Sequence, residues 1–352
     1  MKKTAQTLLA ASIILALTAC SDSGDLPGKP YEPSPKPPEP VFPSLLDISG
    51  KAVKGTLMGA TVELFNANDL DTMIKTVQTG ADGSYTLSLR DDSGEQISGA
   101  YVVKVTADDD STMICDAAVS CGDVDRGETV PAAALAGLTL SSFTFADSAA
   151  EKAPAVNVNS LSTMATDAII SAATLDGSAI DLGNLTQATA TDLQIAGSEV
   201  VGAIIGVDLS GVDLFSLSIV DASVAADIST DDSIAATLTL VNGSLSNIDV
   251  AIDSTIGASL VNYFVNVETI SSAIFGDENV DLGADFSDEM AAINLVQADV
   301  SAESDLLLTE INLGLPPEDE VIVEVIPPAV DADEITDIIG DITVGTGATG
   351  GS

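Results

Sequence analysis

The sequence contains no histidine and no tryptophan, and aromatic residues make up only 3% of the chain. Without histidine, Ser-His-Asp and Cys-His nucleophile systems, histidine general bases and histidine-containing zinc sites are all excluded. No G-x-S-x-G motif or P-loop is present either. Carboxylate pairs are abundant, but so many carboxylates without aromatic platforms do not single out a glycosidase. We therefore expect a protein that is not an enzyme.

Positive charge is scarce and stops early in the chain. There are 11 Lys and Arg against 54 Asp and Glu, which gives a formal charge of −43. The last cation is Lys152, and residues 153–352 hold 33 acidic residues and no Lys or Arg. This part can form no salt bridge among its own side chains. A field so negative excludes nucleic acid and anionic lipid headgroups as partners, and it favours adaptation to saline surroundings.

The acidic residues leave calcium binding open as an alternative. Asp108, Asp109 and Asp110 are weak candidates for metal ligands, because calcium prefers hard oxygen ligands. Their spacing matches neither an EF-hand loop nor a nonapeptide repeat. We predict no cofactor, with a calcium-dependent structural protein as the open alternative.

The first twenty residues have the pattern of an export signal. Lys2 and Lys3 precede an apolar run of about ten residues, which is shorter than the ~20 that a membrane span needs. Residues 17–20, "LTAC", resemble the lipobox of bacterial lipoproteins. The resemblance implies cleavage of a signal peptide 1–19 and acylation of Cys20, which anchors the chain to a membrane. An ordinary signal peptide is the alternative. Ser21 after the cysteine favours the outer over the inner membrane.

A linker follows the predicted anchor. Residues 27–43, "PGKPYEPSPKPPEPVFP", hold eight of the fourteen prolines. Such a run favours an extended polyproline-like spacer of about 3.1 Å per residue. We therefore assign residues 20–46 to the lipidated cysteine and a proline-rich tether.

Strand patterns fill the next region, which we assign to a β-sandwich domain at 47–150. Val, Ile, Thr and Tyr alternate with polar residues, and Asp82-Gly83 is a strong turn signal. The segments "GKAVKGTLMGATVELF", "KTVQTGADGSYTLSL" and "GAYVVKVTA" resemble the carboxypeptidase regulatory-like (transthyretin-like) domain. The resemblance implies an accessory or binding module without catalytic residues. Another immunoglobulin-like sandwich is the alternative.

Two cysteines lie at the end of this region, in "MICDAAVSCGD". In an exported protein, Cys115 and Cys121 are expected to form a local disulfide. A two-thiolate metal site is the competing interpretation, but no other Cys or His is available to complete it.

From Ser160 onward the apolar spacing becomes helical, and we predict a helical domain at 156–313. We expect one helix from Ser160, a second over 186–205, a third capped by Thr230 and a fourth capped by Ser287. The segments "SLSIVDASV" and "NYFVNVETI" could instead be strands, so a mostly β chain is the alternative to this α+β fold. Residues 314–352 read as an acidic, then Gly-rich tail. In it "VIVEVI" is a candidate strand and the last ten residues are expected to be disordered.

Together these features indicate a non-catalytic, membrane-anchored lipoprotein of the cell envelope. The order and composition of its segments resemble those of envelope lipoproteins of Gram-negative bacteria. We expect a binding or structural module, in adhesion or biofilm formation, with an envelope protein as partner. The alternative is an accessory protein for uptake of an apolar nutrient such as a lipid or alkane, bound between the helices.

Overall fold

Strands form the first part of the described chain. The computed structural model describes residues 43–150, 155–248, 255–276 and 280–345. The predicted signal peptide, Cys20 and all but the last few residues of the linker 20–46 lie outside these residues. The strands are β1 (Ser44–Val53), β2 (Leu57–Met58), β3 (Thr61–Asn66), β4 (Asp69–Gln78), β5 (Ser84–Asp91), β6 (Ser98–Thr106), β7 (Thr112–Ile114), β8 (Ser120–Cys121), β9 (Val124–Asp125), β10 (Thr129–Pro131), β11 (Thr139–Asp147) and β12 (Val158–Asn159).

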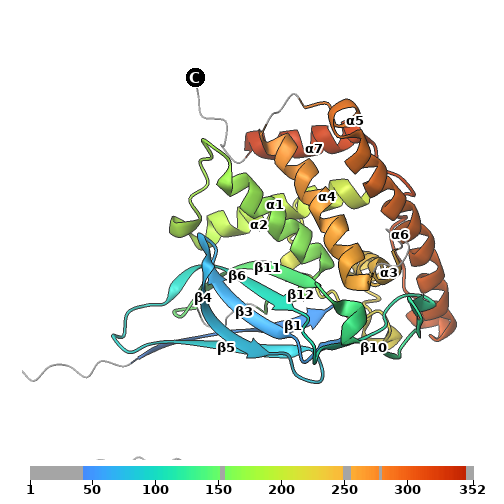
Figure 1. Ribbon diagram of the computed structural model, residues 1–352, viewed down its shortest axis with the longest axis horizontal. Helices are drawn as coiled ribbons and strands as arrows, with labels where there is room; N and C mark the ends of the chain where they lie inside the picture. Colours follow the sequence, from blue (N-terminus) through green and yellow to red (C-terminus); the bar gives the residue numbers. More distant parts are fainter. Residues whose placement is uncertain (1–42, 151–154, 249–254, 277–279, 346–352) are drawn as a thin grey trace, which may run out of the picture. The chain divides into compact units, whose positions relative to one another are not determined.

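The strands form two stacked layers with smaller sheets beside them. One layer is a four-stranded antiparallel sheet in the order β11-β6-β3-β4. The other holds β1, which pairs antiparallel with β5 over eight positions, from Ser44↔Asp91 to Lys51↔Ser84. β12 runs parallel to β1 on its other side. Figure 1 shows β1 and β5 on one face of the four-stranded sheet and helices on the opposite face. The sheets are therefore sandwich-like, as the alternation predicted.

Local sequence accounts for the strand positions. β5 alternates buried Tyr85 and Leu87 with exposed Thr86 and Ser88, the period-two pattern of a strand with one covered face. The predicted turn at Asp82-Gly83 is confirmed, since Gly83 has a φ of +71°, which glycine adopts without steric cost.

β11 differs from β5 because both of its faces and its free edge are covered. Seven of its nine residues are buried. The backbone N–H of Ser141 donates to the Thr163 hydroxyl at 2.9 Å, and that of Phe143 donates to the Thr166 hydroxyl at 2.9 Å. The two threonines belong to helix α1 (Ser160–Thr174). The helix thus satisfies backbone donors at a sheet edge that would otherwise be free to pair with another strand.

Helices follow the strands in the sequence, which confirms the α+β fold class. After α1 come α2 (Gln187–Ile205), α3 (Ser233–Ser244), α4 (Ile256–Gly276), α5 (Leu282–Asp285), α6 (Ser287–Leu313) and α7 (Ala332–Gly345). Short 3-10 turns lie at η1 (Ala132–Leu135), η2 (Leu182–Asn184), η3 (Leu214–Ser216), η4 (Ala225–Asp227), η5 (Leu245–Asn247) and η6 (Pro317–Asp319). The alternative of a mostly β chain is wrong, because "NYFVNVETI" lies inside α4 and "SLSIVDASV" forms no strand.

Side-chain caps decide where the helices begin. Asn159 caps α1 and Thr186 caps α2, each in a reciprocal capping box that satisfies backbone donors of the first turn. Thr230 was the wrong cap for α3, because the Asp232 carboxylate accepts from the Ala235 N–H at 3.0 Å and the helix begins at Ser233. Ser287 is the first residue of α6 rather than its cap. The preceding turn, α5, leads through Phe286 directly into this helix.

The segment after α6 is extended but forms no strand, so the predicted strand "VIVEVI" is wrong. Its backbone groups bond to side chains instead of to another strand. Asn312 of α6 contacts Val321 through both its amide nitrogen (3.1 Å) and its oxygen (2.9 Å). The Glu324 N–H donates to the Thr237 hydroxyl of α3 at 2.9 Å. The acidic tail then forms α7, so disorder remains a prediction only for residues 346–352, which lie outside the described residues.

Strands and helices share one apolar core. The buried cluster that contains Leu64 and Phe143 of the sheet continues through Met164 of α1 to Tyr263 of α4. The described residues from 43 to 345 accordingly form one compact unit. The change from strand to helix falls at Asn159 and Ser160, inside the predicted transition.

Candidate functional site

The two cysteines of "MICDAAVSCGD" are joined in a disulfide, as predicted. Cys115 follows β7 and Cys121 ends β8, so the chain between them doubles back. Their Cα atoms are 5.6 Å apart and the S–S distance is 2.08 Å. Both cysteines are buried. The bond closes a short loop whose first residue is Asp116.

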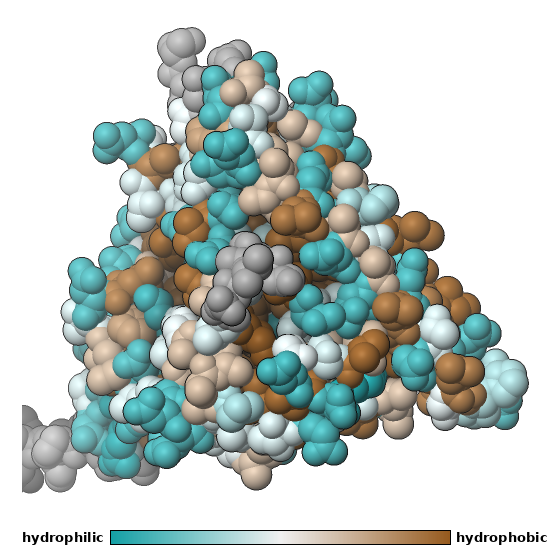
Figure 2. Space-filling view, turned by 45° about the vertical axis from the view of Figure 1, so that its right-hand side comes forward, coloured by the Kyte–Doolittle hydropathy of each residue, from teal (hydrophilic) through white to brown (hydrophobic). Residues whose placement is uncertain are grey.

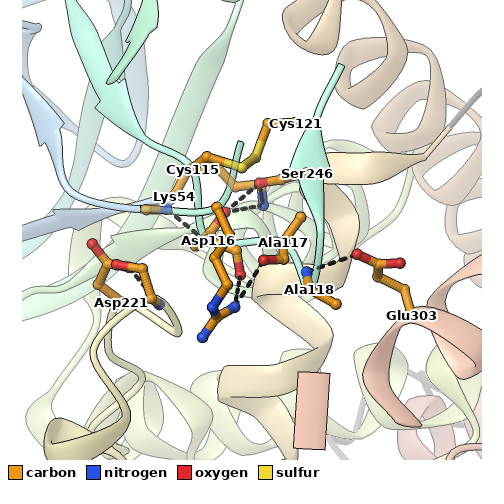
Figure 3. The surroundings of a disulfide bond; sticks show 12 residues. Lys54, Cys115, Asp116, Ala117, Ala118, Cys121, Asp221, Ser246 and Glu303 are labelled. Carbon is orange, nitrogen blue, oxygen red and sulfur yellow. Dashed lines mark hydrogen bonds and ion pairs between the residues drawn. A yellow bond between two sulfur atoms is a disulfide. The ribbon is translucent and has the colours of Figure 1, made fainter. Parts of the chain in front are cut away.

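Asp116 lies beside the one lysine that is buried in the described part of the chain. Lys54 follows the last residue of β1, and its Nζ is 3.7 Å from Oδ1 of Asp116. Both side chains have an exposure of 0%. Figure 3 shows the two groups meeting beneath the disulfide. Isolated charges are costly to bury, so such a pair requires further hydrogen bonds to be stable.

Ser246 and the backbone supply those bonds. The Ser246 hydroxyl donates to Oδ1 of Asp116 at 2.5 Å and accepts a hydrogen bond from Nζ of Lys54. The Gly55 N–H donates to Oδ2 of Asp116 at 2.6 Å. Nζ of Lys54 also donates to the carbonyl oxygen of Asn242 at 2.5 Å. We call Lys54, Asp116 and Ser246 the buried triad. Nζ of the lysine and both carboxylate oxygens of the aspartate therefore each have a hydrogen-bond partner.

Burial shifts the pKa values of Lys54 and Asp116 in the directions that favour their neutral forms. Burial lowers the pKa of Lys54, and the neighbouring Asp116 carboxylate only partly opposes that shift. Burial likewise raises the pKa of Asp116, against the effect of the Lys54 ammonium. The neutral forms of the amine and of the carboxyl group are thus more accessible here than in water.

The buried triad joins the strand-rich part to the helices. Ser246 belongs to η5 and Asn242 to α3, whereas Lys54 and Asp116 come from the strand-rich part. Nearby, the Ala118 N–H donates to the Glu303 carboxylate of α6 at 2.7 Å.

Arg126 adds a second bridge of the same kind. Its guanidinium donates to the Ala117 carbonyl at 2.8 Å and to the carbonyl of Ala222. The disulfide loop is therefore held against helical segments by polar contacts on several sides.

A cavity of about 530 Å³ adjoins the buried triad. Gly55, Thr56 and Asp221 line the side nearest to it, and the Thr56 hydroxyl donates to Asp221 at 2.7 Å. Lys51 and Asp82 line another part of its wall. The cavity is thus polar at the point where it approaches Lys54 and Asp116.

A second group of ionisable residues lies between β6 and the helices. Asp167 of α1, Glu268 of α4 and Lys104 of β6 line a smaller cavity of about 180 Å³. Burial, reinforced by the negative charge of Glu268, raises the pKa of Asp167 to about 7. This carboxyl group therefore titrates near neutral pH.

The three calcium candidates occupy a turn after β6. Asp108 accepts hydrogen bonds from the Thr61 hydroxyl (2.9 Å), the Asp110 N–H (3.0 Å) and the Ser111 hydroxyl (3.1 Å). These bonds lower the pKa of Asp108. Asp109 and Asp110 are exposed. Within the described residues, no three or more Cys, Asp or Glu side chains are grouped as a metal site requires.

The buried triad has the composition of a Ser-Lys nucleophile pair, which sequence reasoning did not identify. A lysine of lowered pKa beside a serine hydroxyl can act as its general base. Here, however, Ser246 is 2% exposed and Lys54 0%, so no external substrate reaches the hydroxyl. Chemistry at this point is confined to the protein's own side chains. The only available sequence signals were a lysine within the apolar "KAVKGTLMG" and an aspartate beside a paired cysteine.

Searches against protein-family models, curated proteins and solved structures found no match to the chain. Among the described residues, no helix combines the length and apolarity needed to span a membrane. Cys20, the predicted lipidation site, lies outside the described residues.

Proposed function

We propose that the protein is a lipid-anchored, non-catalytic lipoprotein of the cell envelope that serves as a binding or structural module. The observation that carries the proposal is the order of three features along the chain. The residues that resemble a lipobox and end at Cys20 are followed by the proline-rich run that we predict to be a tether, and β1 begins directly after that run, at Ser44. The order is that of an anchor, a spacer and a folded module.

The attachment of β1 supports a role in which the module is held against force. A load on the tether enters the module at the first residue of β1, whose pairing with β5 runs antiparallel over eight positions. The ladder hydrogen bonds lie perpendicular to the strand, so they resist together the part of a load that acts along it. At the far end of β1, Lys54 is fixed to Asn242 and Ser246. We propose adhesion or biofilm contacts as the setting, and an immunoglobulin- or transthyretin-like fold for the strand-rich part.

The outer surface offers places for an envelope protein partner. Apolar side chains on α6, including Leu295 (58% exposed) and Leu313 (77%), reach solvent. Figure 2 shows apolar residues at several separate places among hydrophilic ones on one face of the molecule. Uptake of an apolar nutrient is the second candidate. The cavity of about 530 Å³ carries the charged residues Lys51, Asp82 and Asp221 in its wall, whereas one of about 480 Å³ is lined largely by apolar residues such as Leu70, Ile170 and Leu182.

Fractionation tests the anchor directly. Cys20→Ala should move the full-length protein from the membrane fraction to the soluble fraction, because the acyl chains are lost. The double variant Cys115→Ser/Cys121→Ser is the matched control and should stay in the membrane fraction, since it retains Cys20. A Cys20→Ala protein that remains in the membrane fraction at the wild-type level would refute the anchor.

A deletion strain separates the two functions. Loss of adhesion or biofilm with normal growth on fatty-acid or hydrocarbon carbon sources supports the proposal. Loss of growth on those sources with normal adhesion favours nutrient uptake instead.

A further inference from the structure

We propose that Lys54 and Asp116 are a modification site at which the chain forms an intramolecular amide (isopeptide) bond between Nζ of the lysine and Cγ of the aspartate. The two groups lie within 3.7 Å, and both are completely buried. The inference is independent of the proposed function.

The first requirement for such a bond is a neutral amine beside a neutral carboxyl group. A proton passes from the Lys54 ammonium to the Asp116 carboxylate, which leaves the net charge of the pair unchanged. Burial favours this exchange, because charged groups lose hydration that a low-dielectric interior does not replace. The lone pair of Nζ is then free to attack Cγ.

The hydrogen bonds around Asp116 give its two oxygens different roles. Oδ2 accepts from the Gly55 N–H at 2.6 Å, so this donor stabilises the negative charge that develops there as Nζ attacks. Oδ1 accepts from the Ser246 hydroxyl at 2.5 Å. Oδ2 therefore becomes the amide oxygen, and Oδ1 leaves.

Ser246 connects the nucleophile to the leaving oxygen. Its Oγ accepts from Nζ of Lys54 while its proton points to Oδ1 of Asp116. One proton moves from nitrogen to Oγ as the Oγ proton moves to Oδ1, which is the transfer that the reaction needs. The Cγ–Oδ1 bond then breaks and one water molecule leaves. No oxidant, reductant or other reactant is consumed.

Two features of the surroundings drive the reaction forward. Holding Nζ of Lys54 3.7 Å from Oδ1 of Asp116 raises the effective concentration of the amine at the carboxyl group. That gain reaches about 10⁵–10⁸ M once the reacting atoms are aligned at about 3–3.5 Å. The product amide replaces a buried ion pair, whose desolvation is costly, with a neutral group. The cavity lined by Gly55, Thr56 and Asp221 begins at the residue after Lys54 and offers space for the released water.

Peptide mapping of the full-length wild-type protein tests the bond. Trypsin does not cleave after an acylated lysine, so the reduced and denatured protein should yield residues 52–75 joined to residues 105–126. The branched peptide should weigh one water molecule less than its two components. Cleavage after Lys51 and Lys75 in the same digest is the internal control. Complete cleavage after Lys54, with residues 55–75 and 105–126 recovered separately, would overturn the proposal and leave an ion pair.

Two variants test the assigned roles. Asp116→Ala removes the electrophile, so trypsin should cleave fully after Lys54; because the digest uses denatured protein, the result does not depend on folding. Ser246→Ala retains both reacting groups but lacks the relay, and at least a tenfold slower appearance of the branched peptide is expected after synthesis. Cross-linking of Ser246→Ala at the wild-type rate would refute the relay.

Discussion

The strand-rich and helical regions differ most in where their positive charge lies. Every Lys and Arg of the chain lies at or before Lys152, whereas the following 200 residues carry 33 acidic groups and no cation. The helical region nevertheless receives cationic donors across the boundary. Lys54 donates to Asn242 and Ser246, and Arg126 donates to Ala222. The helical region, which has no cations of its own, is thus bound to the strand-rich region through Lys54 and Arg126.

In the helical region, side-chain caps stabilise the first turns of three helices. Asn159, Thr186 and Asp232 each accept a backbone N–H of the first turn. No basic residue is available in the last turns of these helices to balance the dipole. Stability here therefore depends on N-terminal caps and on a few buried contacts with the strand-rich region. The changes below test the buried contacts and the uneven charge, in order of decreasing effect.

Loss of the buried cation should have the largest effect. Lys54→Met removes the partner of Asp116, both as the cation of the ion pair and as the amine of the proposed amide. Leaving one member of a buried pair alone costs about 3–5 kcal/mol. Urea unfolding should show this loss in the free energy of unfolding. Lys75→Met removes an exposed lysine from β4 and is the control, with an expected change within about 0.5 kcal/mol. Equal effects of the two substitutions would contradict a special role for Lys54.

Opening the disulfide should cost less. Cys115→Ser/Cys121→Ser removes a bond between residues six positions apart, and loop-closure entropy for so short a loop is worth about 2 kcal/mol. Urea unfolding of the variant and of the reduced wild type should give similar losses. A variant as stable as the oxidised wild type would show that the loop around Asp116 is held without the bond.

Asp167 should make stability depend on pH. Its pKa is raised to about 7 in the folded state, above the ordinary value of about 3.9, so the folded state binds the proton more tightly. The free energy of unfolding should therefore fall as pH rises from about 4 to about 7. Relative to wild type, Asp167→Asn should be more stable at pH 8 by about 1–2 kcal/mol, with the difference vanishing near pH 4. A difference that does not vary with pH would contradict this assignment.

Added salt should change the stability of the protein least. Raising NaCl from about 0.1 to about 1 M shortens the Debye length from about 10 to about 3 Å, which screens repulsion among the acidic groups. We expect the free energy of unfolding to rise by about 1 kcal/mol, which corresponds to a rise in Tm of about 2–4 °C for a domain of 150–250 residues. EDTA at constant ionic strength should leave Tm unchanged. A lower Tm in EDTA would point to bound divalent cations instead of screening.

Short-range patterns made most of the fold predictable. Alternation, the Asp82-Gly83 turn and the Cys115–Cys121 spacing are local, and the structure confirms each. The caps of α3 and α6 were misplaced, because several Ser, Thr and Asp residues competed near each helix start. Long-range hydrogen bonds to side chains of α6 and α3 explain why "VIVEVI" is extended without being a strand.

The buried triad could not be predicted from spacing. Lys54 and Ser246 are separated by 192 positions, and Ser246 and Asp116 by 130. No periodicity connects residues so far apart, and a lysine at the end of a strand is ordinarily exposed. Only the folded arrangement brings the three together.

Contacts such as the buried triad should make the two regions one folding unit, and hydrogen exchange of the wild-type protein at increasing urea measures this. Exchange would be followed by mass spectrometry in peptides from β1 and β5 and in peptides from α3. All of these peptides should lose protection at the same urea concentration. Loss of protection in α3 at a clearly lower concentration, with β1 and β5 still protected, would contradict a single folding unit.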